Sequence, residues 1–270
     1  MALTTPATLE RREYKYLVEE ATIDRIRDAI SGACVTDPHA EATGRYLIDT
    51  LYLDTPDLAV YRATIEDARD RFKLRIRGYP SAPGAPVFFE VKRRIGDTIV
   101  KTRAGVTGDW TRFLEWDDAT PFDTLNATQR RAIDNFVCHY HRQPMRPRAL
   151  VRYEREPYFS LLDEYARVTF DRAISCQEAT ELSLVPRDRF RAVDDALVLV
   201  ELKWAGAVPA WMSHMVRTIG LRRESFCKYT SGLEAIGAAA AEDDRAYMRA
   251  PARRSAPSST SRRSRDRRAS

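Results

Sequence analysis

Basic and apolar side chains alternate along residues 72–79, which read FKLRIRGY. Successive side chains of a β-strand point to opposite faces, so Lys73, Arg75 and Arg77 are expected to share one face of a strand. The other face is aromatic and aliphatic, and is suited to being covered by an amphipathic helix. A sheet that contains this strand must bury one face and accommodate three cations on the other.

The same alternation recurs in several other predicted strands. Charged side chains share a face at Glu13 and Lys15, Glu90 and Lys92, Lys101 and Arg103, Arg152 and Glu154, Arg167 and Asp171, and Glu201 and Lys203. For any one strand, a polar face in water is a sufficient explanation. The repetition over several strands needs another explanation, because cations predominate on these faces although residues 1–250 carry a net charge of −1. The formal charge of +5 comes from residues 251–270, which hold seven Arg and one Asp.

If such strands curve into a barrel with their charged faces inward, the interior cannot be a dry core. Burying an unpaired charge is costly, and crowding many cations together is more so. The arrangement becomes tolerable when the interior is wide, wet and occupied by a polyanion. Phosphate chains fit, because Lys and Arg supply N–H donors to successive phosphoryl groups. A few carboxylates could hold the divalent metal that accompanies a nucleoside triphosphate.

The remaining pattern predicts an α+β fold with a largely antiparallel sheet. Helices are expected at residues 22–31, 110–116, 126–141 and 226–241, and one is expected to begin near Pro209. We expect residues 1–9 to be a flexible N-terminus and residues 10–241 to form one domain. Residues 242–270, rich in Arg and Ser, are expected to be a disordered tail because they contain too few apolar groups to fold.

Several classes of protein are excluded or disfavoured by the sequence. No apolar run approaches the ~18 residues that a membrane span needs, and the N-terminus lacks a signal-peptide pattern. The common nucleotide-binding, metalloprotease and serine-hydrolase motifs are absent. The four Cys are far apart and form no zinc or disulfide pattern, so we expect reduced thiols in a cytoplasmic protein. Any catalysis must therefore use Lys, Arg, Asp and Glu.

Eight short motifs together resemble a known family, the VTC domain. They are Glu13-Tyr14-Lys15-Tyr16, Tyr52-Leu53-Asp54-Thr55, Lys73-x-Arg75-x-Arg77, Glu90-x-Lys92, Lys101-x-Arg103, Arg167-Val-Thr-Phe-Asp171, Glu201-x-Lys203 and Lys228-Tyr229. This domain is the polyphosphate polymerase of the vacuolar transporter chaperone complex and its bacterial relatives. It belongs to the triphosphate tunnel metalloenzymes, or CYTH-like superfamily, and the resemblance covers about residues 10–235.

The resemblance implies a fold and a reaction. The fold is an eight-stranded antiparallel β-barrel, or tunnel, flanked by helices. The reaction transfers the terminal phosphoryl group of ATP to a growing chain of inorganic polyphosphate, with Mn²⁺ or Mg²⁺ as cofactor. ATP and polyphosphate would thus be the partners of the tunnel, and the sequence predicts no oligomeric state.

Together with the charged strand faces, the resemblance also implies roles for individual residues. Arg75, Arg77 and Lys92 would act on the transferred group, Glu201 would be the principal metal ligand, and Glu13 would be a weaker candidate ligand. The expected phosphate-binding residues are Lys15, Arg62, Lys73, Lys101, Arg103, Arg152, Arg167, Lys203 and Lys228. Tunnel triphosphatases usually open with the motif Glu-x-Glu-x-Lys, whereas this chain has Arg11 at the first position. The loss of that carboxylate favours a polymerase.

Two alternative functions remain open at this point. An inorganic triphosphatase or polyphosphatase would use the same tunnel with water as the nucleophile. A non-catalytic protein would bind polyphosphate and release it unchanged. The Arg-rich tail could in addition bind the phosphate backbone of a nucleic acid, which makes the tail the one expected site for such a partner.

Overall fold

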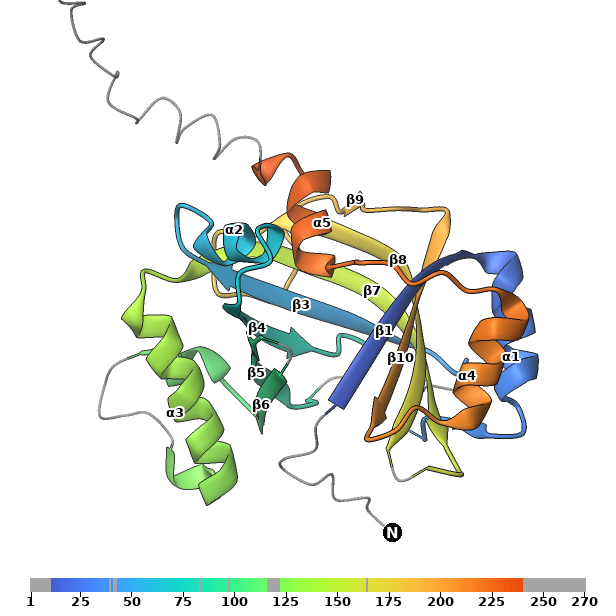
Figure 1. Cartoon of the computed structure of the whole chain (residues 1–270). Helices are drawn as coiled ribbons and strands as arrows, with labels where there is room; N and C mark the ends of the chain where they lie inside the picture. Colours follow the sequence, from blue (N-terminus) through green and yellow to red (C-terminus); the bar gives the residue numbers. More distant parts are fainter. Residues whose placement is uncertain are drawn as a thin grey trace, which may run out of the picture.

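A single large antiparallel sheet organises the protein in the computed structural model (Figure 1). The structure describes residues 11–38, 40, 43–82, 84–96, 98–115, 122–163 and 165–239. Eight strands form the main hydrogen-bonded path, in the spatial order β1 (Arg11–Glu19), β10 (Leu197–Ala205), β8 (Ala166–Glu178), β7 (Arg146–Ser160), β3 (Tyr46–Asp54), β4 (Asp70–Gly78), β5 (Val87–Ile95) and β6 (Thr98–Val106). Two short strands lie beside this path: β2 (Cys34–Thr36) pairs with β7, and β9 (Arg191–Ala192) pairs with β8.

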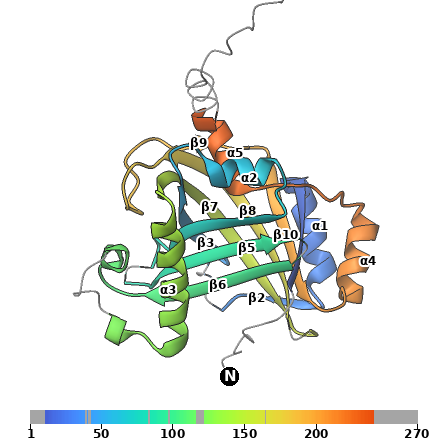
Figure 2. The ribbon, with the colours of Figure 1, turned by 60° about the vertical axis from the view of Figure 1, so that its left-hand side comes forward.

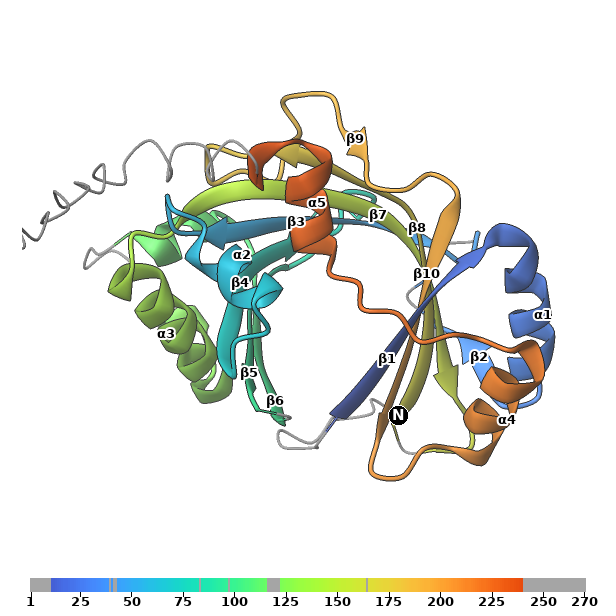
Figure 3. The same ribbon diagram turned by 45° about the horizontal axis from the view of Figure 1, so that its top comes forward.

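The sheet is strongly curved, so that β1, β10 and β8 face β4, β5 and β6 across its concave side, the tunnel side (Figure 3). One wall consists of β4, β5 and β6, and we call it the β4–β6 wall. The other consists of β1, β10 and β8, and we call it the β1–β8 wall; β7 and β3 join the two. The predicted α+β fold, an eight-stranded antiparallel β-barrel or tunnel with flanking helices, is therefore confirmed, although the barrel is not closed. Within the described residues no ladder joins β1 to β6, so the sheet stays open along that side.

Helices cover the convex side of both walls. Against the β1–β8 wall lie α1 (Glu20–Ile30) and α4 (Ala210–Ile219), and the stripe Ile23, Ile26 and Ile30 of α1 is fully buried there. Against the β4–β6 wall lies α3 (Ala127–Arg142), with the 3-10 helices η1 (Trp110–Leu114) and η2 (Phe122–Thr124) beside it (Figure 2). Because the apolar faces of the strands are covered from outside, the charged faces point to the concave side.

The last helix, α5 (Lys228–Ala235), packs on the concave side instead. Its residues Tyr229 and Leu233 are buried against Val151 of β7 and Leu199 of β10. Gly232 permits this close approach, since a Cβ there would lie 3.0 Å from the Sγ of Cys176. Helix α5 therefore fills one part of the concavity with apolar side chains and leaves the rest polar.

A buried carboxylate ties α5 to the short helix α2 (Ala59–Ile65). Asp54 ends β3, and its side chain accepts hydrogen bonds from Val60 N at 2.8 Å and Tyr61 N at 2.9 Å. Its Oδ2 also accepts one from the Tyr229 hydroxyl at 2.7 Å. A single side chain thus orders the start of α2 and the position of α5.

Most predicted elements lie close to their observed bounds, and the exceptions have local causes. Helix α5 ends at Ala235, six residues before the predicted end, and Gly237 follows with φ +74°, a conformation that breaks helices. The short strand β2 was not expected. None of the described helices is both long and apolar enough to cross a membrane. The predicted flexible N-terminus, residues 1–9, and the predicted tail, residues 242–270, lie outside the described residues.

Candidate functional site

The inner face of the β4–β6 wall carries charged side chains in rows across its strands. The register sets them as Lys73–Lys92–Lys101 and as Arg75–Glu90–Arg103. Residues directly opposite each other in antiparallel strands share a face, so all six point away from the helix-covered side. Arg77 begins a third row, opposite Phe88. This wall therefore presents six basic side chains and a single carboxylate.

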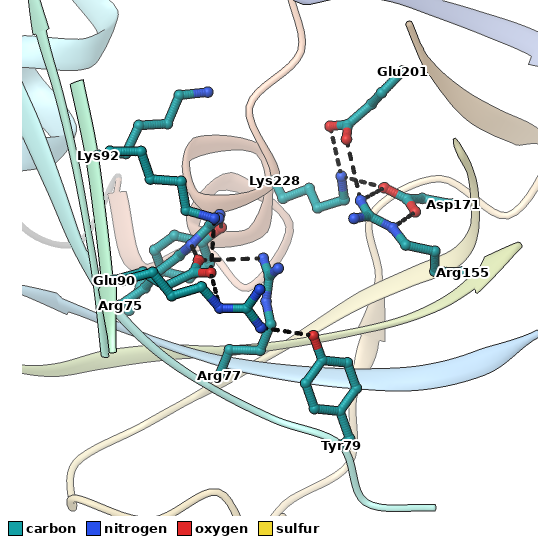
Figure 4. A network of polar contacts seen from close by, with 12 residues as sticks. Arg75, Arg77, Tyr79, Glu90, Lys92, Arg155, Asp171, Glu201 and Lys228 are labelled. Atoms are coloured by element: carbon teal, nitrogen blue, oxygen red, sulfur yellow. Dashed lines mark hydrogen bonds and ion pairs between the residues drawn. The ribbon is translucent and has the colours of Figure 1, made fainter. Parts of the chain in front are cut away.

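Glu90 is fully buried and binds the cations around it (Figure 4). Its Oε2 accepts a hydrogen bond from Arg75 Nε at 2.6 Å, and its Oε1 accepts one from Lys101 Nζ at 2.8 Å. Arg103 Nε lies 3.3 Å and Arg77 Nη2 lies 3.8 Å from the same carboxylate. Burial alone raises the pKa of Glu90, but the charges of Arg75 and Arg77 outweigh it and hold the pKa well below its usual value. Glu90 is thus the ionised centre that holds this wall together.

Arg77 keeps an unused hydrogen-bond donor in the tunnel. Its side chain is 8% exposed, and among the described residues its Nε has no hydrogen-bond partner. The same holds for the buried Oγ1 of Thr50, its neighbour across β3 and β4, and of Thr169 on the opposite wall. Buried polar atoms in proteins are almost always paired. These three atoms are therefore suited to contact an oxygen-rich ligand or water.

The lysines of this wall are crowded enough to lose affinity for their protons. Burial lowers the pKa of Lys101 to about 7, Glu90 opposes this effect, and neighbouring guanidinium groups add to it. Burial also lowers the pKa of Lys73. Glu13 raises the pKa of Lys92, but burial and the charge of Lys15 outweigh it, so that the pKa is lowered. An anion among these ammonium groups would restore their charge.

The β1–β8 wall mixes the two signs of charge more evenly. Its rows are Glu13–Lys203–Arg167, Lys15–Glu201–Thr169 and Leu199–Asp171–Arg155, the last residue coming from β7. Three of these side chains are carboxylates, compared with one on the β4–β6 wall. The two walls therefore differ in how far the protein itself neutralises its cations.

Two carboxylates and two cations form a closed ring at the centre of the β1–β8 wall (Figure 4). Arg155 donates to both oxygens of Asp171 at 2.6 and 2.7 Å, and to Glu201 Oε2 at 3.1 Å. Lys228, the first residue of α5, lies 2.6 Å from Asp171 and 3.1 Å from Glu201 Oε1. Lys203 Nζ donates to Glu201 Oε2 at 2.5 Å. The ring joins α5 to three strands and keeps both carboxylates ionised.

Lys15 lies between two carboxylates at the edge of this ring. Its Nζ is 3.3 Å from Glu13 and 3.8 Å from Glu201, and it donates to the Phe226 carbonyl at 2.7 Å. Glu13 also lies 3.5 Å from Lys92 of the other wall. This ion pair links the walls on the side where the sheet is open.

The structure thus brings together most of the residues predicted from the sequence. The basic side chains of the charged rows and of α5 are Lys15, Lys73, Arg75, Arg77, Lys92, Lys101, Arg103, Arg155, Arg167, Lys203 and Lys228. The carboxylates among them are Glu13, Glu90, Asp171 and Glu201. Eleven cations therefore face four carboxylates, and the excess of positive charge is available to a polyanion.

Two predicted phosphate-binding residues do not join this cluster. Arg152 lies on the opposite face of β7, where it donates to both oxygens of Asp49 at 2.8 and 2.7 Å. Arg62 is on α2 and forms an ion pair with the exposed Asp57. Each is therefore neutralised by a carboxylate of its own, and neither belongs to the charged rows.

Three charged inner-face residues were not predicted as site residues: Glu90 of the β4–β6 wall, and Arg155 and Asp171 of the ring. Arg155 follows Val151 and Tyr153 on one face of β7, and this face is apolar because α5 packs on it. The sequence signal for Arg155 was the period of two, which continues from Val151 to Arg155. Asp171 is the last residue of the motif Arg167-Val-Thr-Phe-Asp171, and in the structure it binds Arg155 and Lys228.

Comparisons with known proteins agree with this arrangement at the level of the family. Residues 10–236 match the model of the VTC domain. A search of curated proteins gave no match. Similar solved structures include putative adenylate cyclases from Bacillus halodurans (13% identity, TM-score 0.42, 81% of this chain and 96% of that one) and Vibrio parahaemolyticus (11%, 0.45, 84% and 99%). Another is a putative adenylyl cyclase from Hippeastrum, described as having a dominant triphosphatase activity (14%, 0.46, 82% and 94%). Identities and scores this low identify no activity.

The curved sheet and its basic inner face, together with the matched domain, define a triphosphate tunnel protein, an enzyme of phosphoryl transfer or hydrolysis. The matched segment covers well over half of the 270 residues. The chain belongs to the VTC domain family.

Tunnel enzymes of this type depend on a divalent metal, which needs a set of ligand atoms in the protein or in its substrate. Mg²⁺ and Mn²⁺ prefer several oxygen ligands, usually carboxylates and water. Among the described residues no group of three or more His, Cys, Asp and Glu side chains could hold a metal. Glu201 is in contact with four cations, and Lys15 separates it from Glu13. These residues do not fit a metal bound by the protein alone.

Proposed function

We propose that this protein is a polyphosphate polymerase, which transfers the terminal phosphoryl group of ATP to a growing polyphosphate chain in its basic tunnel. The observation that carries the proposal is the set of eleven cations against four carboxylates on the concave face of the sheet. Such a set is stable only with a highly charged anion nearby. Polyphosphate provides a negative charge on every phosphoryl unit along its length.

Arg75, Arg77 and Lys92 are assigned to the group in transfer. They come from adjacent strands. Among the residues that the structure describes, Arg77 has an unused donor, and the one ion pair of Lys92 is a 3.5 Å contact to Glu13. Phosphoryl transfer requires alignment and neutralisation of charge on the transferred oxygens, and fixed cations supply both. Glu90 fixes Arg75 in place, which reduces the reorganisation needed during the reaction.

The chemical step needs no general base from the protein. A terminal phosphate oxygen of the chain, already ionised, attacks the γ-phosphorus of ATP. A new P–O bond forms as the bond to the β-phosphate oxygen breaks, and ADP leaves with the bonding electrons. This agrees with a tunnel whose inner rows contain no His.

The cations of the β1–β8 wall are assigned to the rest of the chain. Lys15, Lys203 and Lys228 are neutralised by carboxylates, so they bind phosphate less strongly than the cations of the opposite wall. Arg11 supports a polymerase over a hydrolase, because it replaces a carboxylate that hydrolases of this class use.

Incubation of the purified protein with ATP and Mn²⁺ or Mg²⁺ tests the proposal. Long polyphosphate chains, seen on a gel and by ³¹P NMR, are the expected product. Orthophosphate alone would show a hydrolase, and tight binding of polyphosphate without turnover would show a binding protein.

Variants then locate the activity in the tunnel. We expect Lys92→Ala to lower kcat by at least about a hundredfold, because a charge aimed at the transferred group is lost. Arg93→Ala is the matched control, since Arg93 is the next residue of β5 and forms an exposed ion pair with Asp70. Its activity should be unchanged. Equal activity of the two variants would contradict the assignment of the tunnel.

A further inference from the structure

We infer that Phe88 and Arg103 form a stacking platform for the nucleobase of ATP at one end of the β4–β6 wall. The inference rests on the proposed function, because it takes ATP as the donor of the phosphoryl group. It adds a place for the nucleoside to a tunnel whose other contacts serve phosphate, and it sets the direction in which ATP lies along the wall.

Phe88 places an aromatic ring among the charged rows of this wall. Its neighbours across the sheet are Arg77 of β4 and Gly105 of β6, so the ring lies on the same inner face as the cations. A Cβ at Gly105 would lie 2.8 Å from Cε1 of Phe88, which is too close for any side chain. Gly105 therefore leaves the room that the ring needs beside β6.

The guanidinium group of Arg103 lies over the Phe88 ring, with its Cζ 3.6 Å from the ring centroid. Its Nε is 3.3 Å from Glu90, and its Nη2 donates to the Tyr79 hydroxyl at 3.2 Å. These three contacts fix the guanidinium group, yet the side chain of Arg103 remains 38% exposed. Arg103, which the sequence predicts to bind phosphate, thus presents a fixed and partly open planar cation.

Two tyrosines extend this aromatic surface (Figure 4). The ring of Tyr79 meets that of Phe88 edge to face, with centroids 5.9 Å apart, and Tyr46 of β3 lies 5.6 Å from Tyr79. All three rings are half-buried. Polyphosphate has no ring and no apolar surface, so these side chains are not suited to the chain. The nucleoside is the aromatic part of ATP, and nucleobases stack on aromatic rings and on guanidinium planes.

The order of residues along β5 gives ATP a direction. Phe88, Glu90 and Lys92 follow one another on the inner face, and Phe88 and Lys92 are about 13 Å apart by the rise of a strand. An extended nucleoside triphosphate spans such a distance. A base on Arg103 therefore places the terminal phosphate near Lys92, which is assigned to the group in transfer. ADP then leaves from the aromatic end, and the chain stays in the rows beyond Lys92.

Calorimetric titration of the full chain with ATP and, separately, with tripolyphosphate tests the platform. The two ligands share three phosphoryl groups and differ in the nucleoside, and EDTA withholds the divalent metal that turnover needs. Phe88→Ala should raise the Kd for ATP at least about tenfold, because base stacking is lost, and the Kd for tripolyphosphate by less than about threefold. Equal changes for the two ligands would overturn the inference and leave the proposed function intact. Failure of the wild-type protein to bind either ligand would instead contradict the proposed function.

Two further variants separate stacking from charge and from general packing. Arg103→Lys keeps the charge but loses the guanidinium plane, so it should weaken ATP at least about fivefold and tripolyphosphate by less than about twofold. Phe190→Ala is the matched control, because it removes the same kind of contact from the other face of β7, where Arg152 Cζ lies 4.7 Å from the Phe190 ring centroid. Both Kd values should then stay unchanged. ATP affinity at the wild-type level in Arg103→Lys, or an ATP-specific loss in Phe190→Ala, would overturn the inference.

Photolabelling with 8-azido-ATP locates the base directly. Mass spectrometry should find the label within residues 77–88 or 103–105, and labelling confined to the β1–β8 wall would overturn the inference. Circular dichroism verifies the fold of each variant. If Phe88→Ala does not fold, Phe88→Leu, which keeps an apolar side chain without an aromatic face, takes its place with the same expected result.

Discussion

The two walls of the tunnel use carboxylates in different ways. The β4–β6 wall gathers four of its cations around the single, fully buried Glu90. The β1–β8 wall has three carboxylates, two of which share Arg155 and Lys228 in a closed ring. Removal of one carboxylate should therefore be severe on the first wall and milder on the second.

This difference suggests that the two walls interact with different parts of one bound ligand. The β4–β6 wall keeps uncompensated positive charge and unused donors, which is what a group in transfer needs for its developing charge. The β1–β8 wall is close to neutral, so it can hold a chain that must also move on. Tight binding everywhere would stabilise the ground state as much as the transition state and would not raise the rate.

The largest expected effect is on stability, from Glu90→Gln. The variant leaves Arg75, Lys101 and their neighbours without a counter-charge, and breaking a buried ion pair in this way costs about 3–5 kcal/mol. Glu201→Gln should cost less, about 1–3 kcal/mol, because Asp171 still neutralises Arg155 and Lys228. Urea unfolding of both variants measures the difference.

Added tripolyphosphate serves as the control for this comparison. It should restore more of the lost stability in Glu90→Gln than in Glu201→Gln, because the β4–β6 wall then lacks all of its own negative charge. Equal losses in the two variants would show that the walls do not differ as described.

A smaller effect is expected from Gly232→Ala, which acts on the helix that supplies Lys228 to the ring. The new Cβ would lie 3.0 Å from Cys176 Sγ and 3.4 Å from Val151 Cγ2, so the Cys176 side chain or α5 must move slightly. Overpacking of this kind costs about 1–3 kcal/mol, partly offset by about 1 kcal/mol from the better helix propensity of Ala. Thermal unfolding gives the net change.

The matched variant for this prediction makes room for the added methyl group. Gly232→Ala combined with Cys176→Ala should be more stable than the sum of the two single variants predicts. If the stability changes of the two single variants were strictly additive in the double variant, the close approach of α5 to β8 would not limit the position of α5.

The smallest effect is a shift of protons on the β4–β6 wall. The pKa of Lys101 is lowered to about 7, so its charge is lost as the pH rises through that value. A bound phosphate chain raises this pKa, and binding at pH 7.5 should therefore take up part of a proton. Calorimetry in buffers of different ionisation enthalpy measures this uptake, and affinity should fall by less than tenfold between pH 6.5 and 7.5.

Two variants separate the sources of this proton uptake. Lys101→Arg stays charged and should take up less. Cys227→Ser controls for the thiol at the start of α5. Burial raises the pKa of this thiol, but Lys73 and other partners outweigh burial and lower the pKa to about 7. If Lys101→Arg left the proton uptake unchanged, the proton would be taken up by a group other than Lys101.

Most inner-face residues could be predicted from the alternation of charged and apolar residues along the strands. The wrong predictions show which information this alternation does not contain. Lys73, Arg75 and Arg77 were placed on the correct face because the apolar face of β4 is covered from outside. On β7 the same reasoning selected Arg152, whereas the inner residue is Arg155. Alternation gives two faces but does not say which is inside, and on β7 the inner face is apolar because α5 packs there.

The ion pairs themselves could not be predicted from sequence, because they join distant segments. Lys228 is 27 residues from Glu201 along the chain, and Arg155 is 46 residues from it. Their meeting depends on the strand order β1-β10-β8-β7 and on the docking of α5, which local patterns do not encode. The open side of the sheet was missed for the same reason.

A crystal structure of the protein with tripolyphosphate tests the central claim most directly. The account predicts phosphate oxygens within hydrogen-bonding distance of Arg75, Arg77 and Lys92 on the concave side of the sheet. It would be contradicted by an empty tunnel with the anion bound on the convex surface, for example at Arg152.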